Sequence, residues 1–473
     1  MYAVIRHSWP LLLGIMLLMV GNGIQGTLLG IRGTIEGFGT YQMSIVMSAY
    51  FVGFLFGSRL TPEMIRKVGH VRVFAALGSL ISAVLILYAA APDWVAWTVM
   101  RVVIGFCFSG VYITAESWLN ASATNETRGQ TLSAYMIMQM VGIIAAQILL
   151  NVGDPGGYLL FVIPSVLVSL AFTPILLSAS PAPSFATTKR MSFKELFEAS
   201  PLGCVGMFLM GGVFSALFGM ASVWGGLQGL TVSEISIFVA AIYVGGLVFQ
   251  YPIGWMSDRM DRRLLILVLA AIGAVLMLLV VLINPPFGVL VVLAALAGGI
   301  ANPVYSLLVA YTNDFLDSSD MASASAGLLF INGVGAITGP LTTGWLMEMI
   351  GPLGFFLYLA VLNALIAGYA GWRMTRRPAM VSSETSAFAI LSPTASPIAV
   401  EVVLEAAQEE AVQAEEAAAV AEAEAQAEVQ AGVRAEVQAA ADAEAQNAAE
   451  AAADASTGNE TQEASGDEPP KAG

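Results

Sequence analysis

Stretches of about 20 predominantly apolar residues, each long enough to cross a lipid bilayer as a helix, recur along most of this chain. Charged residues make up only 11% of the 473 residues and hydrophobic residues 57%. A soluble globular domain carries about 25% charged residues to cover its surface. The apolar stretches therefore exclude a string of soluble domains and predict an all-α, polytopic membrane protein embedded in a lipid bilayer.

Turn residues divide the apolar region into twelve predicted transmembrane helices. The first apolar run, from Trp9 to Leu29, is too long for the apolar region of a signal peptide and lacks a small-residue cleavage site. We therefore expect it to remain as the first helix. The predicted helices cover residues 8–30, 41–60, 71–91, 94–119, 130–151, 157–179, 201–227, 233–256, 263–283, 287–312, 322–349 and 352–374.

Lysine and arginine residues gather in the even-numbered connections of this arrangement. Because cytoplasmic loops carry an excess of these residues, we expect both termini to be cytoplasmic and the chain to lie in the inner (plasma) membrane. Arg32 falls on the outer side and Arg101 within a helix. The tenth connection departs from the pattern, because it holds Asp314, Asp317 and Asp320 without a base. The cytoplasmic side would hold fifteen of the seventeen basic residues among the first 377 positions, namely Arg6, Arg59, Arg66, Lys67, Arg72, Arg128, Lys189, Arg190, Lys194, Arg259, Arg262, Arg263, Arg373, Arg376 and Arg377.

The two halves of the helical region show a weak internal repeat. The segment from Gly110 to Asn120 matches the segment from Pro303 to Asn313 at a constant offset of 193 residues. Together with the even split of the helices, this match predicts two pseudo-symmetric six-helix bundles, as in transporters built from repeats. The predicted domains are an N-terminal bundle at residues 1–180, a cytoplasmic linker at 181–200, a C-terminal bundle at 201–377 and a tail at 378–473.

The net charge of −15 comes from the tail, which has 19 acidic residues against Arg434 and Lys471. Alanine and glutamate favour helix, but the scattered valines form too thin a stripe to bury. We expect an acidic, low-complexity cytoplasmic tail that has no core of its own. A solvated, dispensable tail and a partner-binding tail are both compatible with this composition. No basic segment is dense enough to bind a nucleic-acid backbone.

The sequence lacks the residues that several classes of chemistry require. None of the four lysines follows a glycine, so the chain has no phosphate-binding loop for ATP. Cys107 and Cys204 each lie in an apolar stretch, where a thiol packs as a small hydrophobe. With two histidines and no Cys/His cluster, we expect no metal and no cofactor. The lack of a His-Glu metal site or a Ser-Lys dyad argues against an intramembrane enzyme.

The string Gly254-Trp-Met-Ser-Asp-Arg-Met-Asp-Arg-Arg263 follows the eighth predicted helix. An aspartate there can lie against a helix N-terminus, where the helix dipole favours an anion, and the arginines can pair with carboxylates. This string resembles the loop signature of the major facilitator superfamily, with Asp261 in place of a glycine. In the first half Thr61 stands where the signature has aspartate, so we expect a stronger ionic gate in the second half. The predicted gate residues are Gly254, Asp258, Arg259, Arg262, Arg263 and Arg128.

Further strings narrow the resemblance. Arg101, Gly105, Ser109 and Gly110 are similar to the arginine-containing motif in the fourth helix of the same superfamily. The strings Glu36-Gly-Phe, Val68-Gly-His, Glu116-Ser-Trp-Leu-Asn, Arg128-Gly and Gln250-Tyr-Pro-Ile-Gly-Trp look like the YcaD-like branch of inner-membrane transporters. The resemblance spans residues 8–374 and implies a transporter, but it brings no substrate with it.

Polar residues within the predicted helices are candidates for a central cavity. Arg101 would lie about 10 Å into its helix, which is costly unless it faces a wet cavity or a partner. Snorkelling to the headgroups is the alternative for Arg101, and an interhelical hydrogen bond is the alternative for each other polar residue. Glycine pairs such as Gly298-Gly299 favour close helix packing. The candidate cavity residues are Asn22, Gln25, Arg101, Tyr112, Glu116, Gln139, Trp224, Tyr243, Asn302, Tyr305 and Asn332.

These features predict a monomeric secondary transporter in which two bundles rock around a midplane site. Protons are the first candidate for the coupling ion, with Glu116 or Asp314 as the carrier, and facilitated diffusion is the alternative. A cavity with aromatic residues and few charges favours an amphipathic small molecule as substrate. A transporter-derived sensor or assembly factor would keep the fold without transport, but the polar face around Arg101 argues against it.

Overall fold

The computed structural model describes residues 2–122, 128–176, 191–376, 388, 391 and 397–460. These residues are helical apart from short turns, and they contain no strand. The all-α membrane fold is confirmed, because the described residues contain eleven helices long and apolar enough to cross a membrane, together with one shorter apolar helix. The chain divides into two compact units, Met1–Gln408 and Glu409–Gly473.

The helices correspond to the twelve predicted spans with two differences. The seventh span is broken at Met220 into two helices, and a short extra helix precedes it in the predicted linker. In chain order the helical elements are α1 (Tyr2–Ile35), α2 (Thr40–Val68), α3 (His70–Ala90), α4 (Trp94–Ser122), α5 (Arg128–Leu149), the 3-10 turn η2 (Leu150–Val152), α6 (Leu159–Leu176), α7 (Phe193–Ala199), α8 (Pro201–Gly219), α9 (Ala221–Leu227), α10 (Val232–Ser257), α11 (Arg262–Ile283), α12 (Phe287–Asn313), α13 (Ser318–Ile350), α14 (Gly354–Met374) and α15 (Pro397–Glu460).

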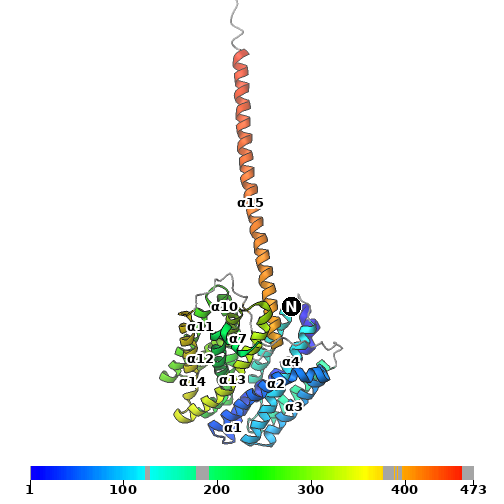
Figure 1. The fold of residues 1–473 in the computed structure, drawn as a ribbon, viewed down its shortest axis with the longest axis vertical. Coiled ribbons are helices and arrows are strands. Elements are labelled where there is room, and N and C mark those ends of the chain that lie inside the picture. Colours follow the sequence, from blue (N-terminus) through cyan, green and yellow to red (C-terminus); the bar gives the residue numbers. More distant parts are fainter. Residues whose placement is uncertain are drawn as a thin grey trace, which may run out of the picture. The chain divides into compact units, whose positions relative to one another are not determined.

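The two bundles repeat the same helix pairs. In the N bundle, α1 to α6, the pairs are α2 with α4, α1 with α5 and α3 with α6. The C bundle, α8 to α14, pairs α10 with α12, α8 with α13 and α11 with α14. Figure 1 shows α1 to α4 in blue and cyan on one side of the body, and α10 to α14 in green and yellow on the other. The pseudo-symmetric two-bundle fold expected from the weak repeat is therefore confirmed.

Paired glycines explain how the central helices approach so closely. A Cβ atom on Gly105 of α4 would overlap the carbonyl oxygen of Tyr50 on α2. Gly298, 193 residues later, is placed in the same way against the carbonyl of Ile242 on α10. Only glycine allows backbones to come this near. The predicted packing role of Gly298 is thus confirmed.

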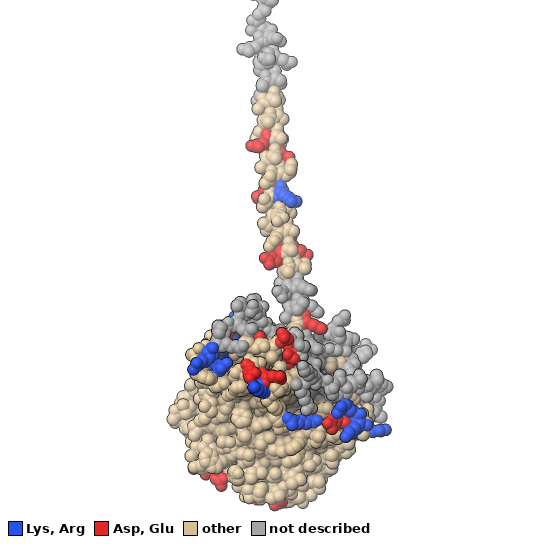
Figure 2. All heavy atoms as spheres, in the orientation of Figure 1, with Lys and Arg blue, Asp and Glu red and all other residues tan. Residues whose placement is uncertain are grey.

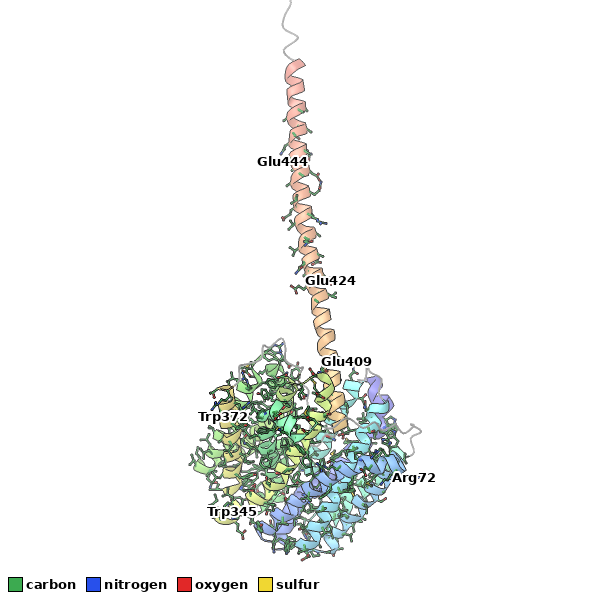
Figure 3. All side chains as sticks on the ribbon, in the orientation of Figure 1. Arg72, Trp345, Trp372, Glu409, Glu424 and Glu444 are labelled. Carbon is green, nitrogen blue, oxygen red and sulfur yellow. The ribbon has the colours of Figure 1, made fainter. Side chains whose placement is uncertain are left out.

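Basic side chains gather at one end of the helical body (Figure 2). We call this the basic end; it includes the connections α2–α3, α10–α11 and α12–α13 and the end of α14, whereas the connections α1–α2, α3–α4, α11–α12 and α13–α14 lie at the opposite end. Figure 3 shows Trp372 near the basic end and Trp345 far from it. Arg32, which the sequence places on the outer side, lies in the last turn of α1, forms an ion pair of 2.6 Å with Glu36 and donates to the Pro155 carbonyl at 3.0 Å. Its charge is neutralised locally, which explains its place at the opposite end.

The tail differs in part from the expectation. In the second unit α15 exposes Val420, Val429, Val433 and Val437, as a helix with a thin apolar stripe should. The first unit, however, extends past the predicted boundary at Pro378 to Gln408. Leu391, Val400 and Leu404 of the predicted tail belong to the hydrophobic core of the first unit, so the tail is not solvated at these residues. Lys189, Arg190 and Arg377 lie outside the described residues.

Candidate functional site

Four residues predicted to line a cavity form one continuous hydrogen-bonded chain between α1 and α4. Arg101 Nη1 donates to Gln25 Oε1 at 2.8 Å, and Gln25 Nε2 donates to Asn22 Oδ1 at 3.0 Å. Asn22 Nδ2 donates to the Tyr112 hydroxyl at 3.0 Å. Helical spacing explains the arrangement, because residues three apart on α1 share a face and eleven residues on α4 make about three turns. These four residues are called the Arg101 network.

The guanidinium of Arg101 is enclosed by groups that do not neutralise it. Arg101 is only 4% exposed, which contradicts the snorkelling alternative. Its Nη2 atom contacts Met47 Sδ at 3.0 Å, and its Cζ atom lies 5.1 Å from the centre of the Tyr50 ring. Arg101 Nε has no hydrogen-bond partner, and no carboxylate pairs with the guanidinium, among the described residues. A buried cation without a counterion can bind an anionic or strongly polar group.

Sequence reasoning missed Met47 and Tyr50, the two α2 residues beside Arg101. They lie three residues apart, so they share one face of α2. The close packing of Gly105 against Tyr50 holds this face next to α4. No signal in the sequence pointed to these two residues, because the pairing of α2 with α4 is known only from the structure.

Glu116 is buried on the same helix as Arg101 but is not part of the Arg101 network. It lies 15 residues after Arg101, or about 22 Å along the helix, toward the basic end. Glu116 Oε1 accepts a hydrogen bond of 2.7 Å from the Tyr135 hydroxyl on α5. Gln139, one turn beyond Tyr135, is buried, and its Nε2 atom has no partner among the described side chains and backbone.

The candidate residues of the C bundle make packing contacts rather than a polar network. Asn332 Nδ2 donates to the Met207 carbonyl on α8 at 3.1 Å, which is the interhelical hydrogen bond of the alternative interpretation. A Cβ on Gly246 would overlap Asn302 Nδ2, so Asn302 packs directly against α10. At the repeat offset of 193 residues, the counterparts of Arg101 and Glu116 are Ala294 and Val309. At these two positions the N bundle carries a charged side chain and the C bundle an apolar one.

Three aromatic candidates of the C bundle lie against other rings. The Trp224 ring centre lies 4.9 Å from that of Phe238, 5.0 Å from that of Phe356 and 5.9 Å from that of Phe355. Tyr305 meets Phe214 edge to face at 6.0 Å, and Tyr243 lies 4.6 Å from Phe218. Trp224 is thus part of an aromatic cluster.

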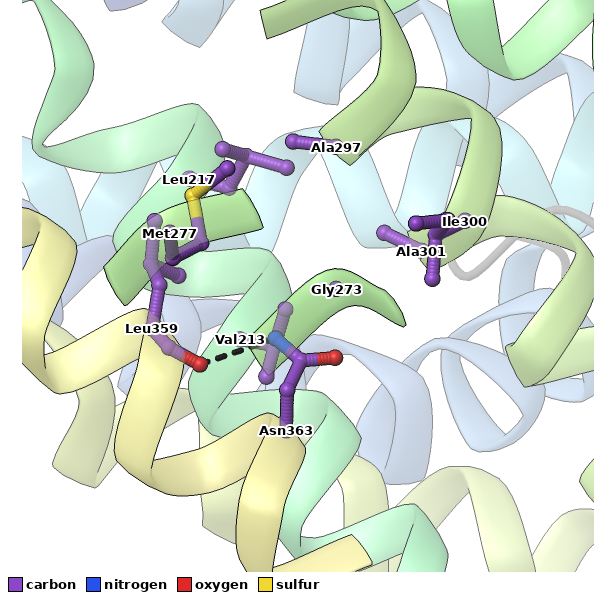
Figure 4. Close-up of a pocket in the computed structure, with 9 residues that line it drawn as sticks. All are labelled: Val213, Leu217, Gly273, Met277, Ala297, Ile300, Ala301, Leu359 and Asn363. Atoms are coloured by element: carbon purple, nitrogen blue, oxygen red, sulfur yellow. Dashed lines mark hydrogen bonds between the residues drawn. The ribbon is translucent and has the colours of Figure 1, made fainter. Parts of the chain in front are cut away.

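A small pocket lies within the C bundle (Figure 4). Its one side chain with hydrogen-bonding groups is Asn363, whose Nδ2 atom donates to the Leu359 carbonyl at 2.8 Å. None of the predicted cavity residues lines it, and its walls offer a substrate little beyond apolar contact. We therefore regard it as a packing defect. Its lining residues are Val213, Leu217, Gly273, Met277, Ala297, Ile300, Ala301, Leu359 and Asn363.

The predicted gate is organised around Arg262 at the start of α11. Arg262 Nη1 lies 2.5 Å from Asp314 Oδ1, Arg262 Nε donates to Ser257 Oγ at 3.1 Å, and Arg262 Nη2 lies 3.6 Å from Asp258 Oδ1. This ion pair joins the α10–α11 connection to the α12–α13 connection. It also explains why Asp314 stands in a connection where basic residues were expected.

Among the described residues, no N–H group of a helix N-terminus donates a hydrogen bond to Asp258. It is 46% exposed, it caps the C-terminal end of α10, and its Oδ1 atom accepts a 3.1 Å hydrogen bond from the backbone N–H of Phe388. A Cβ on Gly254, one turn earlier, would lie 2.7 Å from the Phe388 ring. Two predicted gate residues therefore contact a segment that sequence reasoning assigned to the solvated tail.

The remaining gate arginines make local contacts. Arg259 Cζ lies 4.2 Å from the centre of the Trp255 ring, and Arg263 Nη2 lies 2.8 Å from Asp261 Oδ2. Partial burial raises the pKa of Asp261, but the hydrogen bonds from the side chain and backbone of Arg263 outweigh this and lower it overall. The side chain of Arg128 lies outside the described residues. In the first half Thr61 is buried beside Gly110, in keeping with the missing aspartate.

The two bundles meet closely at the opposite end of the body. Ser48 Oγ on α2 donates to the Ile337 carbonyl on α13 at 2.5 Å. A Cβ on Gly344 of α13 would overlap Ser44 on α2, and a Cβ on Gly30 of α1 would overlap Ser222 on α9. Small residues on both sides allow this close contact.

The arrangement of two repeated bundles with a charged loop after α10 agrees with comparisons to known proteins. The Major Facilitator Superfamily profile matches residues 11–233 and 204–407. The chain belongs to the major facilitator superfamily. It is therefore a multi-pass membrane protein of a transporter family, as the resemblance implied.

Two relatives in this superfamily are each named uncharacterized MFS-type transporter YcaD. The protein from Escherichia fergusonii is 29% identical over 372 residues, which cover 76% of this chain and 93% of the relative. The protein from Salmonella arizonae is 26% identical over 363 residues, covering 75% of this chain and 92% of the relative. The YcaD-like resemblance is confirmed.

Solved structures show the same fold at lower sequence identity. A variant of the nucleoside transporter NupG superposes with a TM-score of 0.67 at 16% identity and covers 77% of this chain and 99% of its own. A bacterial homolog of the human lysosomal transporter Spinster, in an inward-facing and occupied conformation, gives a TM-score of 0.62 at 16% identity, covering 79% of this chain and 97% of its own. These superfamily members establish the architecture and leave the substrate of this chain open.

Proposed function

We propose that this chain is a proton-coupled secondary transporter of a bacterial inner membrane, moving a small molecule by alternating access as a monomer. The observation that carries the proposal is the Arg101 network, a buried polar chain with an unneutralised guanidinium in the interior of a transporter fold. A fold that had lost transport would have no reason to retain such a costly group. This argues against the alternative of a membrane sensor or assembly factor.

The orientation follows from the positions of the basic residues. Because lysine and arginine favour the cytoplasmic side, the basic end is the cytoplasmic face and both termini are cytoplasmic. A reporter enzyme fused after Arg376 should be active only if it functions in the cytoplasm. Activity of a periplasmic reporter at that position would contradict this orientation.

The close contacts at the opposite end support a state that opens toward the cytoplasm. Ser48 with Ile337 and Gly344 with Ser44 join α2 to α13 on the proposed periplasmic side. In alternating access, one bundle rocks against the other around a central site. The periplasmic contacts would then separate when the cytoplasmic side closes.

Proton coupling is supported by the buried carboxylate of Glu116. A carboxyl group that can exchange one proton, held by the Tyr135 hydroxyl on a neighbouring helix, is suited to carry protons through a low-dielectric interior. The fucose:proton symporter FucP shares the fold at a TM-score of 0.50 and 15% identity. FucP is a proton symporter, and proton coupling of this chain is part of the proposal.

A ligand-stability screen followed by a flux assay tests the proposal. We expect a hit to raise the melting temperature of the purified wild-type protein and to raise that of Arg101→Gln much less. In proteoliposomes the same compound should accumulate only when a proton gradient is imposed. Equal flux with and without the gradient would support facilitated diffusion, and binding without flux would support a sensor.

A further inference from the structure

A short part of the tail is buried in the first unit. Leu391 and Val400 are each 2% exposed and Leu404 is 5% exposed, and all three belong to the hydrophobic core of that unit. From Phe388 to Val400 the sequence has no charged residue, unlike the acidic stretch that follows. An uncharged, apolar segment can enter a protein interior at little electrostatic cost. The described residues Phe388, Leu391 and those of α15 up to Gln408 are together called the docking segment.

The first contact of the docking segment is with two gate residues, Asp258 and Gly254. The backbone N–H of Phe388 donates to Asp258 Oδ1 at 3.1 Å, and the Phe388 ring lies 2.7 Å from where a Cβ on Gly254 would be. Asp258 is thereby shared between the docking segment and Arg262, which lies 3.6 Å away. The aspartate of the superfamily loop signature is engaged by the chain's own tail.

The second contact lies deeper between α10 and α12. The backbone N–H of Leu391 donates to Ser306 Oγ at 3.1 Å, and Ser306 Oγ donates to the Leu391 carbonyl at 3.3 Å. Gln250 Nε2 on α10 donates to the same Ser306 oxygen at 3.0 Å. Both backbone groups of Leu391 are therefore satisfied by a buried side chain, as a stably docked segment requires.

The third contact is on α13. Gln408 Nε2 contacts Met321 Sδ at 3.2 Å near the start of that helix. The docking segment thus contacts α10 and α13, and these are helices of the C bundle that also pack on the N bundle, through α5 and α2 respectively. Its contacts lie at the basic ends of α10 and α13, whereas Ser48 and Ser44 mark the close contacts with the N bundle at the opposite end.

We propose that the docking segment is an autoinhibitory plug, which holds the transporter open toward the cytoplasm and must withdraw before the basic end can close. In this proposal, closing brings the basic ends of α10 and α13 toward the N bundle, and the docked residues on these helices have to leave before the two ends can meet. It would also require Asp258 to exchange its Phe388 partner for one in the closed gate. The proposal rests on the alternating access proposed above.

Cysteine labelling tests the proposal without a known substrate. In a background of Cys107→Ala and Cys204→Ala, we would place a single cysteine at Ser306 and add an impermeant maleimide to inside-out vesicles. In the full chain the docking segment should protect Ser306→Cys. In a chain that ends at Pro378 labelling should be at least about tenfold faster, since a segment docked in nine of ten molecules slows labelling by that factor. A chain that ends at Gln408 is the matched control and should stay protected.

A second cysteine reports the conformational equilibrium. Ser44→Cys lies in the contact between α2 and α13 at the opposite end and should be protected from the periplasmic side in the full chain. Ending the chain at Pro378 should speed its labelling severalfold, because the outward-open state becomes populated, whereas ending it at Gln408 should not. If the truncated chain folds poorly, the full-length variant Leu391→Asp replaces it, with Val437→Asp in the second unit as its control.

Two results would overturn the proposal. Equal labelling of Ser306→Cys in the full chain and in the chain ending at Pro378 would show that the segment is not docked. Faster labelling of Ser306→Cys without any change at Ser44→Cys would show that the docked segment does not hold the transporter in the state open toward the cytoplasm. Flux measured separately in the same truncated chain decides whether transport itself occurs, so the two proposals can fail independently.

Discussion

Arg262 Nη1 lies 2.5 Å from Asp314 Oδ1, and the two side chains are 2% and 4% exposed. This buried ion pair joins two connections of the C bundle that are separated by the whole of α11 and α12. Removing one partner of a buried pair leaves an uncompensated charge, which is far more costly than replacing both partners. The pair is therefore a structural joint of the gate and should tolerate paired substitution better than single substitution.

We expect Arg262→Met and Asp314→Leu each to lower the free energy of unfolding by about 3–5 kcal/mol. The double variant should recover much of that loss, because both charges are gone. Thermal unfolding of the wild type, the two single variants and the double variant in one detergent measures this double-mutant cycle. Arg259→Met is the control, since Arg259 is exposed; additive losses in the double variant would contradict the buried pair.

Arg101→Ala should weaken ligand binding at least about tenfold, since a hydrogen bond to a charged group contributes about 1.5–3 kcal/mol. The variant removes the guanidinium that connects Gln25 to α4 and faces Tyr50. Titration of a screening hit with the purified variant measures the effect. If Arg101→Ala changes only the folding yield and leaves affinity intact, Arg101 has a structural role and the cavity assignment fails.

Glu116→Gln should convert proton-coupled flux into passive exchange. Glutamine keeps an oxygen that can accept the hydrogen bond from Tyr135, but it cannot exchange a proton. Counterflow, which needs no proton gradient, should persist while accumulation is lost. Tyr135→Phe serves as the comparison because it removes the hydrogen bond and keeps the carboxyl group. Undiminished accumulation in Glu116→Gln would exclude this residue as the proton carrier.

Gly105→Ala should destabilise the protein by about 1–3 kcal/mol or prevent its folding, because the added methyl group overlaps the Tyr50 carbonyl. Gly368→Ala in α14 is the matched control, since nothing lies within 4 Å of the position of its Cβ. That substitution should be neutral or stabilise the helix. The melting temperatures of Gly105→Ala and Gly368→Ala, measured in one detergent, test this difference. Similar losses in both variants would mean that helix approach is not the cause.

The sequence by itself predicted the number and order of the membrane helices. An apolar stretch of about 20 residues must form a helix in a bilayer, because every backbone group has to be satisfied within the segment. This requirement is local, so hydropathy and turn residues were enough, and the break at Met220 did not change the count. The motif from Gly254 to Arg263 and the residues Asn22, Gln25 and Arg101 were likewise recognisable as polar groups in an apolar setting.

The tertiary structure decided which partners these residues have. Hydropathy measures the transfer of a side chain out of water, and this is the same whether the side chain then meets lipid, another helix or the chain's own tail. The pairing of Arg262 with Asp314 and the position of Met47 beside Arg101 depend on how distant helices pack. Leu391 looked like part of a solvated tail because the tail as a whole is acidic and of low complexity. Its burial depends on a binding surface formed by α10 and α12, which exists only after the bundle has folded.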